Sequence, residues 1–141
     1  MIYFYFIINT FSNEIKIIYK INDSIITNHD ILEEINYLTS LNTNLSQLNK
    51  EQLFSNATNS LIREIIKKEE IKKIYEINYE DAIQSVKVNS IIERFRKKIG
   101  FNSNREFEDY LSNKNVDLSA LKMKFVIEQF WNQLIYDKYN K

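Results

Sequence analysis

The chain has 141 residues, with 19 basic and 19 acidic side chains, one histidine, one glycine, and no proline or cysteine. These counts exclude disulfides, thiolate nucleophiles, histidine-rich metal clusters and glycine-rich phosphate loops, and the zero formal charge argues against strong sequence-independent nucleic-acid binding. At 44% hydrophobic and 27% charged residues, the composition predicts one folded domain that is too polar for a membrane bundle.

Residues 1–12 are predicted to be the remnant of a signal peptide. Residues 2–8 are continuously apolar, which is too short to span a bilayer but fits the lower end of a signal-peptide core. Thr10 and Ser12 are small residues spaced two apart, as a cleavage site requires, so Asn13 is a candidate mature N-terminus. No basic segment precedes the apolar run, and a buried N-terminal strand is the alternative.

The next residues predict a β-hairpin. Residues 15–21 are rich in β-branched and aromatic side chains, residues 22–24 have turn chemistry, and residues 25–26 are apolar again. Thr27 and Asp30 then have the spacing of a capping box, which predicts that a helix begins here.

Helices are predicted for the rest of the chain from apolar residues that recur at spacings of three and four. Residues 42–49 are polar and are predicted to form a loop. The predicted helices run over about 28–41 and about 50–75, from Asn78 to Gly100, from Ser103 to about 113–115, and over about 118–139.

Three residue types mark the boundaries of the later helices. Gly100, the only glycine, is predicted to close the third helix in a left-handed conformation. Ser103 with Glu106 forms a capping box, and Asp117 is the N-cap of the last helix. The expected fold is mainly α, with a short N-terminal β-hairpin followed by about five helices around one core.

Charged and titratable residues give no catalytic constellation and no metal site. His29 lies beside Asp30 near a predicted helix start, where an exposed, neutral histidine is the simpler interpretation. The sequential pairs Glu33–Glu34 and Glu69–Glu70 point about 100° apart on a helix and are predicted to be solvated. In residues 94–98 basic side chains alternate with Phe95 as in single-stranded nucleic-acid binders, but Phe95 falls on the apolar stripe of its helix.

Aromatic residues exceed what one small core needs, and they gather toward both ends of the chain. There are nine tyrosines, nine phenylalanines and one tryptophan. The final predicted helix is apolar around much of its circumference, which is typical of a central helix or of one that docks on a second surface. As a group these aromatic residues predict a surface for apolar peptides, with candidate peptide-binding residues Phe107, Tyr110, Phe125, Phe130 and Trp131.

Residues 17–31 (Ile-Ile-Tyr-Lys-Ile-Asn-Asp-Ser-Ile-Ile-Thr-Asn-His-Asp-Ile) resemble the start of the N-terminal domain of SurA-type periplasmic chaperones. In that family a strand, an Asn-containing turn, a second strand and a Ser/Thr-x-x-Asp helix start follow one another. The resemblance continues through residues 61–66, residues 107–111 and residues 130–135, so it extends over nearly all of residues 13–141.

The resemblance implies a peptide-binding domain that acts in the periplasm. It implies clients that are unfolded outer-membrane proteins, with a preference for aromatic-rich segments, and it implies no cofactor, no nucleic acid and no stable membrane insertion. In the family one or two parvulin-type prolyl isomerase domains normally follow, and this chain ends at Lys141, where the first would begin. None of their catalytic residues can be carried over, so binding without isomerase activity is expected.

Two other functions stay open at this point. The domain can be the docking part of a longer parvulin-type isomerase, or can form a homodimer, through its broad apolar last helix. A small helical nucleic-acid binder that uses Arg94, Arg96, Lys97 and Lys98 is the third interpretation.

Overall fold

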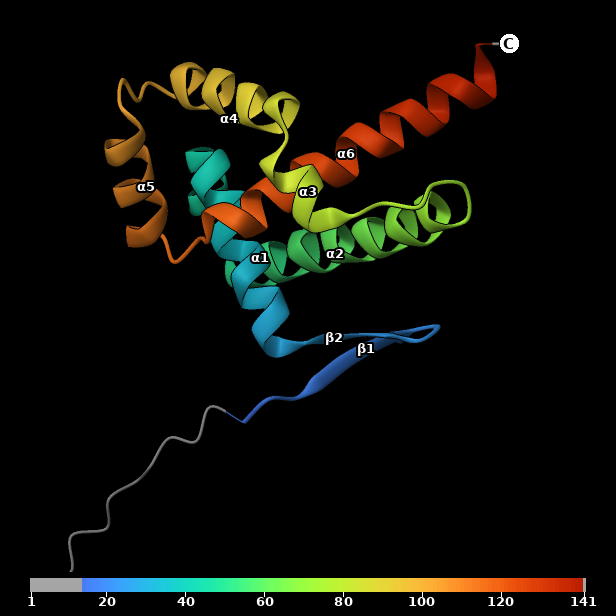
Figure 1. The fold of residues 1–141 in the computed structure, drawn as a ribbon. Helices are drawn as coiled ribbons and strands as arrows, with labels where there is room; N and C mark the ends of the chain where they lie inside the picture. Colours follow the sequence, from blue (N-terminus) through green and yellow to red (C-terminus); the bar gives the residue numbers. More distant parts are fainter. Residues whose placement is uncertain (1–13, 141) are drawn as a thin grey trace, which may run out of the picture.

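The computed structural model describes residues 14–140 and confirms a mainly helical chain that begins with a β-hairpin (Figure 1). The predicted signal remnant, residues 1–12, and the alternative N-terminal strand both lie outside the described residues. The elements are β1 (Ile17–Ile21), β2 (Ser24–Thr27), α1 (Asn28–Leu41), the 3₁₀-helix η1 (Thr43–Gln47), α2 (Lys50–Lys72), α3 (Tyr79–Gln84), α4 (Val86–Lys98), α5 (Asn104–Asn113) and α6 (Leu118–Tyr139).

The hairpin forms where the sequence predicts it. β1 and β2 pair antiparallel with Ile21 opposite Ser24, and Asn22 takes a left-handed conformation in the turn, with φ 51°. Asparagine tolerates this region better than most residues because its short polar side chain bonds locally. Ile26 is 1% exposed and packs toward α1 and α2, whereas Ile17 on the paired strand is 64% exposed.

Helix starts follow the predicted caps. The Thr27 hydroxyl accepts from the Asp30 amide at 3.2 Å, and the Asp30 carboxylate accepts from the Thr27 amide at 2.7 Å. Ser103 and Glu106 make the same reciprocal pair at the start of α5. Each capping box satisfies two amides that the first turn of a helix leaves without intrahelical partners.

Helix ends are closed by two residues with positive φ. Gly100, at φ 97°, donates to the Lys97 carbonyl, and the next amide, of Phe101, donates to the Arg96 carbonyl. These two bonds form a Schellman motif, which confirms the predicted end at Gly100. Asn115, at φ 54°, closes α5 in the same way.

The third predicted helix is two helices, so the prediction of one continuous helix is wrong. Ser85 has extended backbone angles, φ −61° and ψ 147°, and separates α3 from α4. Its amide donates to the Ala82 carbonyl and its hydroxyl accepts from the Val88 amide. One serine therefore ends the first helix and caps the second, which apolar spacing alone does not reveal.

Two smaller differences concern the second predicted helix. α2 ends at Lys72, three residues before the expected end, and the predicted loop before it contains η1. The start of α2 has an N-cap that was not predicted: Asn49 and Gln52 form a capping box. Asn-x-x-Gln before an apolar run is a recognisable signature of such a start.

The core consists of two clusters. One lies between α4, α5 and α6 and contains the buried residues Val88, Ile92, Phe107, Leu111, Val116, Leu121 and Val126. The other lies between the hairpin, α1 and α2, with Ile26, Ile31 and Ala57 at its centre. α6 packs against both α2 and α4, and it runs diagonally between them in Figure 1.

The two clusters are also joined by polar contacts. The Tyr110 hydroxyl of α5 donates to the Ser40 carbonyl of α1 at 2.7 Å, and Lys124 of α6 pairs with residues of α1 and α2. No helix within residues 14–140 has both the length and the continuous apolar character that crossing a membrane requires.

Candidate functional site

The five predicted peptide-binding residues lie in α5 and α6 but do not form one shared groove. Phe107 is 2% exposed and belongs to the core between α4, α5 and α6. Tyr110 packs its ring on Phe101, with centroids 4.8 Å apart, while its hydroxyl bonds to α1. Both residues therefore contribute contacts that hold α5 in place.

The three predicted residues of α6, Phe125, Phe130 and Trp131, are half-buried and lie along different faces of the helix. Phe125 packs on Phe95 with centroids 5.6 Å apart, and Phe130 packs on Tyr75 at 5.7 Å. Trp131 has the Lys67 ammonium 5.8 Å from its ring centroid. Each ring therefore contacts a side chain of a neighbouring helix or loop. The role of these residues in peptide binding stays a prediction.

The last turns of α6 carry exposed apolar side chains. Tyr136 is 61% exposed, Tyr139 is 69% exposed and Ile135 is 36% exposed, and we call these three residues the α6 end patch. In Figure 1 these turns extend away from the other helices. Aromatic and branched side chains held in water at this density are typical of a surface that binds apolar groups.

Two cavities lie on either side of this part of α6. A cavity of about 470 Å³ lies between α4 and α6, where Ile91, Phe125 and Tyr136 are among its lining residues. A second, of about 450 Å³, lies between α6 and the segment after α2, where Ile74 and Tyr75 contribute. Each is large enough for an aromatic side chain.

A larger cavity of about 640 Å³ lies between α4, α5 and the start of α6. Phe107 reaches it from the core, and Arg96 contributes a guanidinium that is mostly buried and donates to the Phe101 carbonyl at 2.6 Å. Exposed polar residues such as Asn89 and Glu93 share its lining. Its walls are therefore mixed in character, in contrast to the more apolar cavities beside α6.

A buried ionic cluster joins α1, α2 and α6. The Lys124 ammonium lies 2.7 Å from a Glu34 carboxylate oxygen and 2.5 Å from a Glu64 oxygen, and Lys68 also contacts Glu64 at 2.7 Å. Lys124 lies over the Tyr37 ring, 4.6 Å from its centroid. Glu34 is 2% exposed, so this is a desolvated group of charges.

The environment of the cluster shifts the pKa values of Glu64, Lys124 and Tyr37. Burial raises the pKa of Glu64, but the ammonium groups of Lys124 and Lys68 outweigh it and hold this pKa below its ordinary value. Burial lowers the pKa of Lys124, but Glu64 and Glu34 outweigh it and raise this pKa overall. Burial, reinforced by nearby carboxylates, raises the pKa of Tyr37. The charged forms of Lys124 and Glu64 are therefore favoured at neutral pH.

The prediction that Glu33 and Glu34 are both solvated is wrong for Glu34. Glu33 is exposed, whereas Glu34 follows Ile31 by three residues and so lies on the buried side of α1. That spacing was the signal in the sequence, because positions three apart share a helix face. The partner, Lys124, is ninety residues away in the sequence and gives no local signal.

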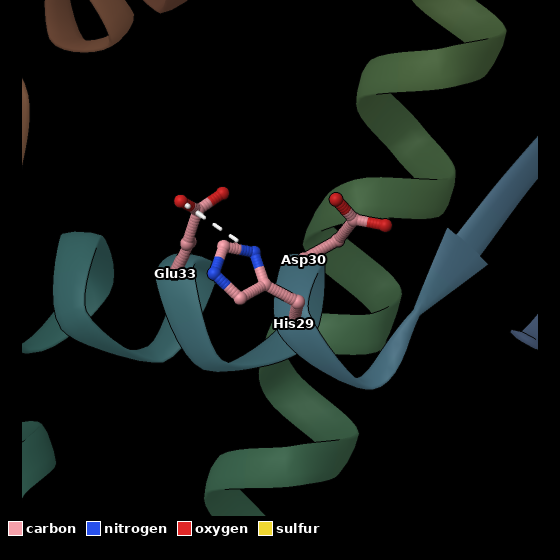
Figure 2. Close-up of side chains that lie close together, drawn as sticks. All are labelled: His29, Asp30 and Glu33. Atoms are coloured by element: carbon pink, nitrogen blue, oxygen red, sulfur yellow. Dashed lines mark ion pairs between the residues drawn. The ribbon is translucent and has the colours of Figure 1, made fainter. Parts of the chain in front are cut away.

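His29, Asp30 and Glu33 lie together on the first turns of α1 (Figure 2). Within residues 14–140 they are the one group of three potential metal ligands whose atoms lie within 4.8 Å of one another. His29 and Glu33 are both exposed, with 3.7 Å between Nδ1 and Oε1, and one Asp30 oxygen is already bonded to Thr27. An open arrangement of this kind is common on protein surfaces and is not a closed coordination sphere.

The basic and aromatic run at the end of α4 is divided between core and surface. Phe95 packs on Phe107 and Phe125, and Arg96 is 6% exposed. Lys97 pairs with Glu93 at 2.7 Å on the surface. The residues that would stack a base and contact phosphate thus point to different environments, and they form no continuous basic and aromatic face.

Searches against protein-family models, curated proteins and solved structures found no match to this chain.

Proposed function

We propose that this domain is a chaperone module that binds unfolded, aromatic-rich polypeptide segments. The observation that carries the proposal is the α6 end patch, with Tyr136 and Tyr139 exposed and an apolar cavity on each side of the helix. A client segment lying along α6 can insert side chains on either side. Phe125 then lines the cavity between α4 and α6, and Tyr75 lines the cavity on the other side.

The expected affinity is modest. Each aromatic side chain that a client buries contributes about 1.5–3 kcal/mol. Ordering the client backbone opposes binding by about 1–2 kcal/mol for each residue fixed. A few aromatic anchors therefore give weak binding that is quickly reversed, which suits a protein that must release its clients.

The cellular setting of the proposal comes from the resemblance to SurA-type chaperones. It assigns the activity to the periplasm and the clients to unfolded outer-membrane proteins. Masking of apolar segments needs neither cofactor nor covalent step. The proposed activity is therefore binding without prolyl isomerisation by this domain.

The proposal is tested by binding of a labelled peptide that contains several Phe and Tyr residues and no stable structure, followed by fluorescence anisotropy. Replacing Tyr136 and Tyr139 together by Ser is expected to weaken binding at least about tenfold, equivalent to 1.4 kcal/mol. The matched control is Phe54→Ser, which removes an aromatic residue that is 39% exposed near the opposite end of α2 from Tyr75.

Equal losses of affinity in Phe54→Ser and in the double tyrosine variant would contradict the assignment to α6. Unchanged affinity in the double variant would also contradict it. Helix content and melting temperature, measured on the same samples, separate lost binding from lost structure.

A second candidate function uses the same surface. The α6 end patch is also suited to permanent docking on another folded domain or on a second copy of the chain. Sedimentation at increasing concentration distinguishes the two functions. A stable dimer that the double tyrosine variant abolishes favours docking, whereas a monomer that still binds peptide favours the chaperone module.

A further inference from the structure

A fourth cavity, separate from the α6 end patch, lies between α1, α2 and the start of α6. Its volume is about 210 Å³, and we call it the acidic cavity. Tyr37 and Leu61 provide part of its apolar lining. Its charged lining consists of the carboxylates of Asp30, Glu33, Glu34, Glu64 and Asp117 and the ammonium group of Lys124.

These groups leave an excess of negative charge around the cavity. Lys124 lies between Glu34 and Glu64, and Lys68 pairs with Glu64 from the α2 surface, so two lysines face five carboxylates. The other three carboxylates, those of Asp30, Glu33 and Asp117, have no lysine or arginine partner among residues 14–140. The Glu33 carboxylate instead lies 3.7 Å from Nδ1 of His29. Such a concentration of one sign of charge in a recess attracts the opposite charge.

Glu34 supplies an independent observation that favours a hydrogen-bond donor at this cavity. This side chain is 2% exposed, and its Oε2 pairs with Lys124. Its Oε1 accepts no hydrogen bond from any of the described residues, although it is fully buried. A buried carboxylate oxygen without a donor is costly, and a donor supplied by a ligand removes that cost.

The remaining carboxylates also keep oxygens that no described residue uses. Asp30 bonds to Thr27 through Oδ2, and Asp117 caps α6 through Oδ2, which leaves Oδ1 of each aspartate available. Both capping bonds fix the side chains at the edge of the cavity. The acceptors are therefore preorganised by the helix starts that hold them.

The spacing of these groups suits an organic cation better than a metal ion. Metal ligands must converge within a few ångströms, and the only described group that does so, His29 with Asp30 and Glu33, does not include Glu34, Glu64 or Asp117. The acidic cavity, with a volume of about 210 Å³, instead has room for an elongated side chain. Tyr37 and Leu61 offer apolar contact for the alkyl part of such a group.

We propose that the acidic cavity binds the cationic side chain of an arginine or lysine in a client polypeptide. The guanidinium or ammonium group donates to Oε1 of Glu34 and to unused carboxylate oxygens at the cavity edge, from Asp30, Glu33 or Asp117, and its alkyl stem lies against Tyr37. That the cation arrives on a polypeptide rests on the proposed function, whereas recognition of the cation by the cavity does not. The domain would then recognise segments that combine aromatic residues with a basic residue.

The test compares two peptides with the same aromatic residues, one containing arginine and one containing citrulline, its neutral analogue. The wild-type chain is expected to bind the arginine peptide about fivefold more tightly at low salt, because partly exposed charge pairs contribute modestly. The double variant with Glu33→Gln and Asp117→Asn is expected to bind both peptides equally. Asn also serves as an N-cap, so this variant keeps the start of α6.

The matched control is a variant with Glu80→Gln and Asp109→Asn, which removes two exposed negative charges away from the cavity. It is expected to retain the preference for the arginine peptide. Equal binding of both peptides by the wild type, or equal loss of the preference in the control, would overturn the proposal. Binding of the citrulline peptide alone reports on the aromatic surface and therefore on the proposed function.

A free probe distinguishes the possible sources of the cation. N-acetyl-arginine methylamide is titrated into the wild-type chain and the cavity variant, with amide shifts of Asn115 and Ala120 followed by NMR. The expected result is weak saturable shifts in the wild type that the variant lacks, with tighter binding when the arginine is in the peptide. Affinity for the free probe equal to that for the peptide would overturn the polypeptide source, and absence of any shift with either ligand would overturn the cation site itself.

Discussion

Lys124 projects from α6 between a carboxylate of α1 and a carboxylate of α2. Burial removes these charges from water, so each of them alone carries a desolvation penalty. Their pairing offsets that penalty. Because Glu34 is 2% exposed, it has very little contact with water that could replace its partner. The position of Lys124 therefore matters more for stability than any surface lysine.

Replacing Lys124 by Met is expected to lower the free energy of unfolding by about 3–5 kcal/mol, since it removes the ion-pair partner of the buried Glu34 carboxylate and leaves Glu64 paired with Lys68 alone. The measurement is urea denaturation at neutral pH. Lys72→Met is the control because Lys72 is an exposed residue in the last turn of α2. A loss in Lys124→Met no larger than in the control would show that the cluster does not hold the three helices together.

The same cluster makes stability depend on pH in a definite direction. The pKa of Glu64 is held below its ordinary value by Lys124 and Lys68, despite burial, which acts in the opposite sense. Its stabilisation is therefore fully present above the pKa of the unfolded chain, about 4.3, and is lost as the pH falls through the lower folded pKa. We expect the urea midpoint to fall in this acid range and the fall to be shallower in Glu64→Gln than in Glu80→Gln, which removes an exposed carboxylate of α3.

At alkaline pH the titration of Lys124 decides how the free energy of unfolding changes with pH. The pKa of Lys124 is raised by Glu64 and Glu34, which outweigh the effect of burial. Its contribution is present below the pKa of an unfolded lysine and disappears as the pH rises through the folded pKa. An unfolding free energy that is independent of pH at both ends of the range would contradict this account of the cluster.

At the scale of the elements, local chemistry predicts where helices begin and end better than it predicts what they bury. The cap residues Thr27, Gly100, Ser103 and Asp117 are local signals, and each acts as expected. Bonds between residues at most a few positions apart decide these boundaries. They can therefore be read from a single sequence.

Ser85 shows the limit of periodicity at this scale. Apolar residues keep their helical spacing through the α3–α4 junction, so the spacing alone predicts a single helix. The break becomes visible only when the serine is considered as an N-cap for Val86 and the residues that follow. Tertiary packing of α3 and α4 against α6 then fixes how these two helices are oriented relative to each other.

Ser85→Ala is expected to lower the free energy of unfolding by about 1 kcal/mol, the usual cost of removing a serine N-cap. Ser90→Ala is the matched control: Ser90 is exposed inside α4, where alanine favours the helix. The comparison is made by thermal and urea denaturation. Equal stability of the two variants would mean that the Ser85 hydroxyl does not support the start of α4.

The candidate sites were only partly predictable for a related reason. Aromatic residues that fill the core and those that line a cavity have the same helical spacing, so Phe107 and Phe125 look alike in the sequence although only Phe107 is fully buried. The acidic cavity was missed because its residues come from distant segments. Contacts between α1 and α6 are set by the fold and have no local signature.

At the scale of the whole molecule, two small cores and one ionic cluster leave several large apolar side chains exposed, and these include two distinct groups. One is the outer hairpin, where Ile17 is 64% exposed and Ile25 is 50% exposed. The other is the α6 end patch, in the last turns of α6, which extend away from the other helices in Figure 1. Apolar surface of this kind gains free energy when it is covered, which is the physical basis for binding an unfolded chain.

The most direct test of the central claim is suppression of aggregation of an unfolded outer-membrane β-barrel protein by this chain, followed by light scattering. Prolyl isomerisation of a test peptide is measured in the same samples. We predict suppression that depends on Tyr136 and Tyr139, with no acceleration of isomerisation. Aggregation that proceeds equally with and without the chain would contradict the chaperone function.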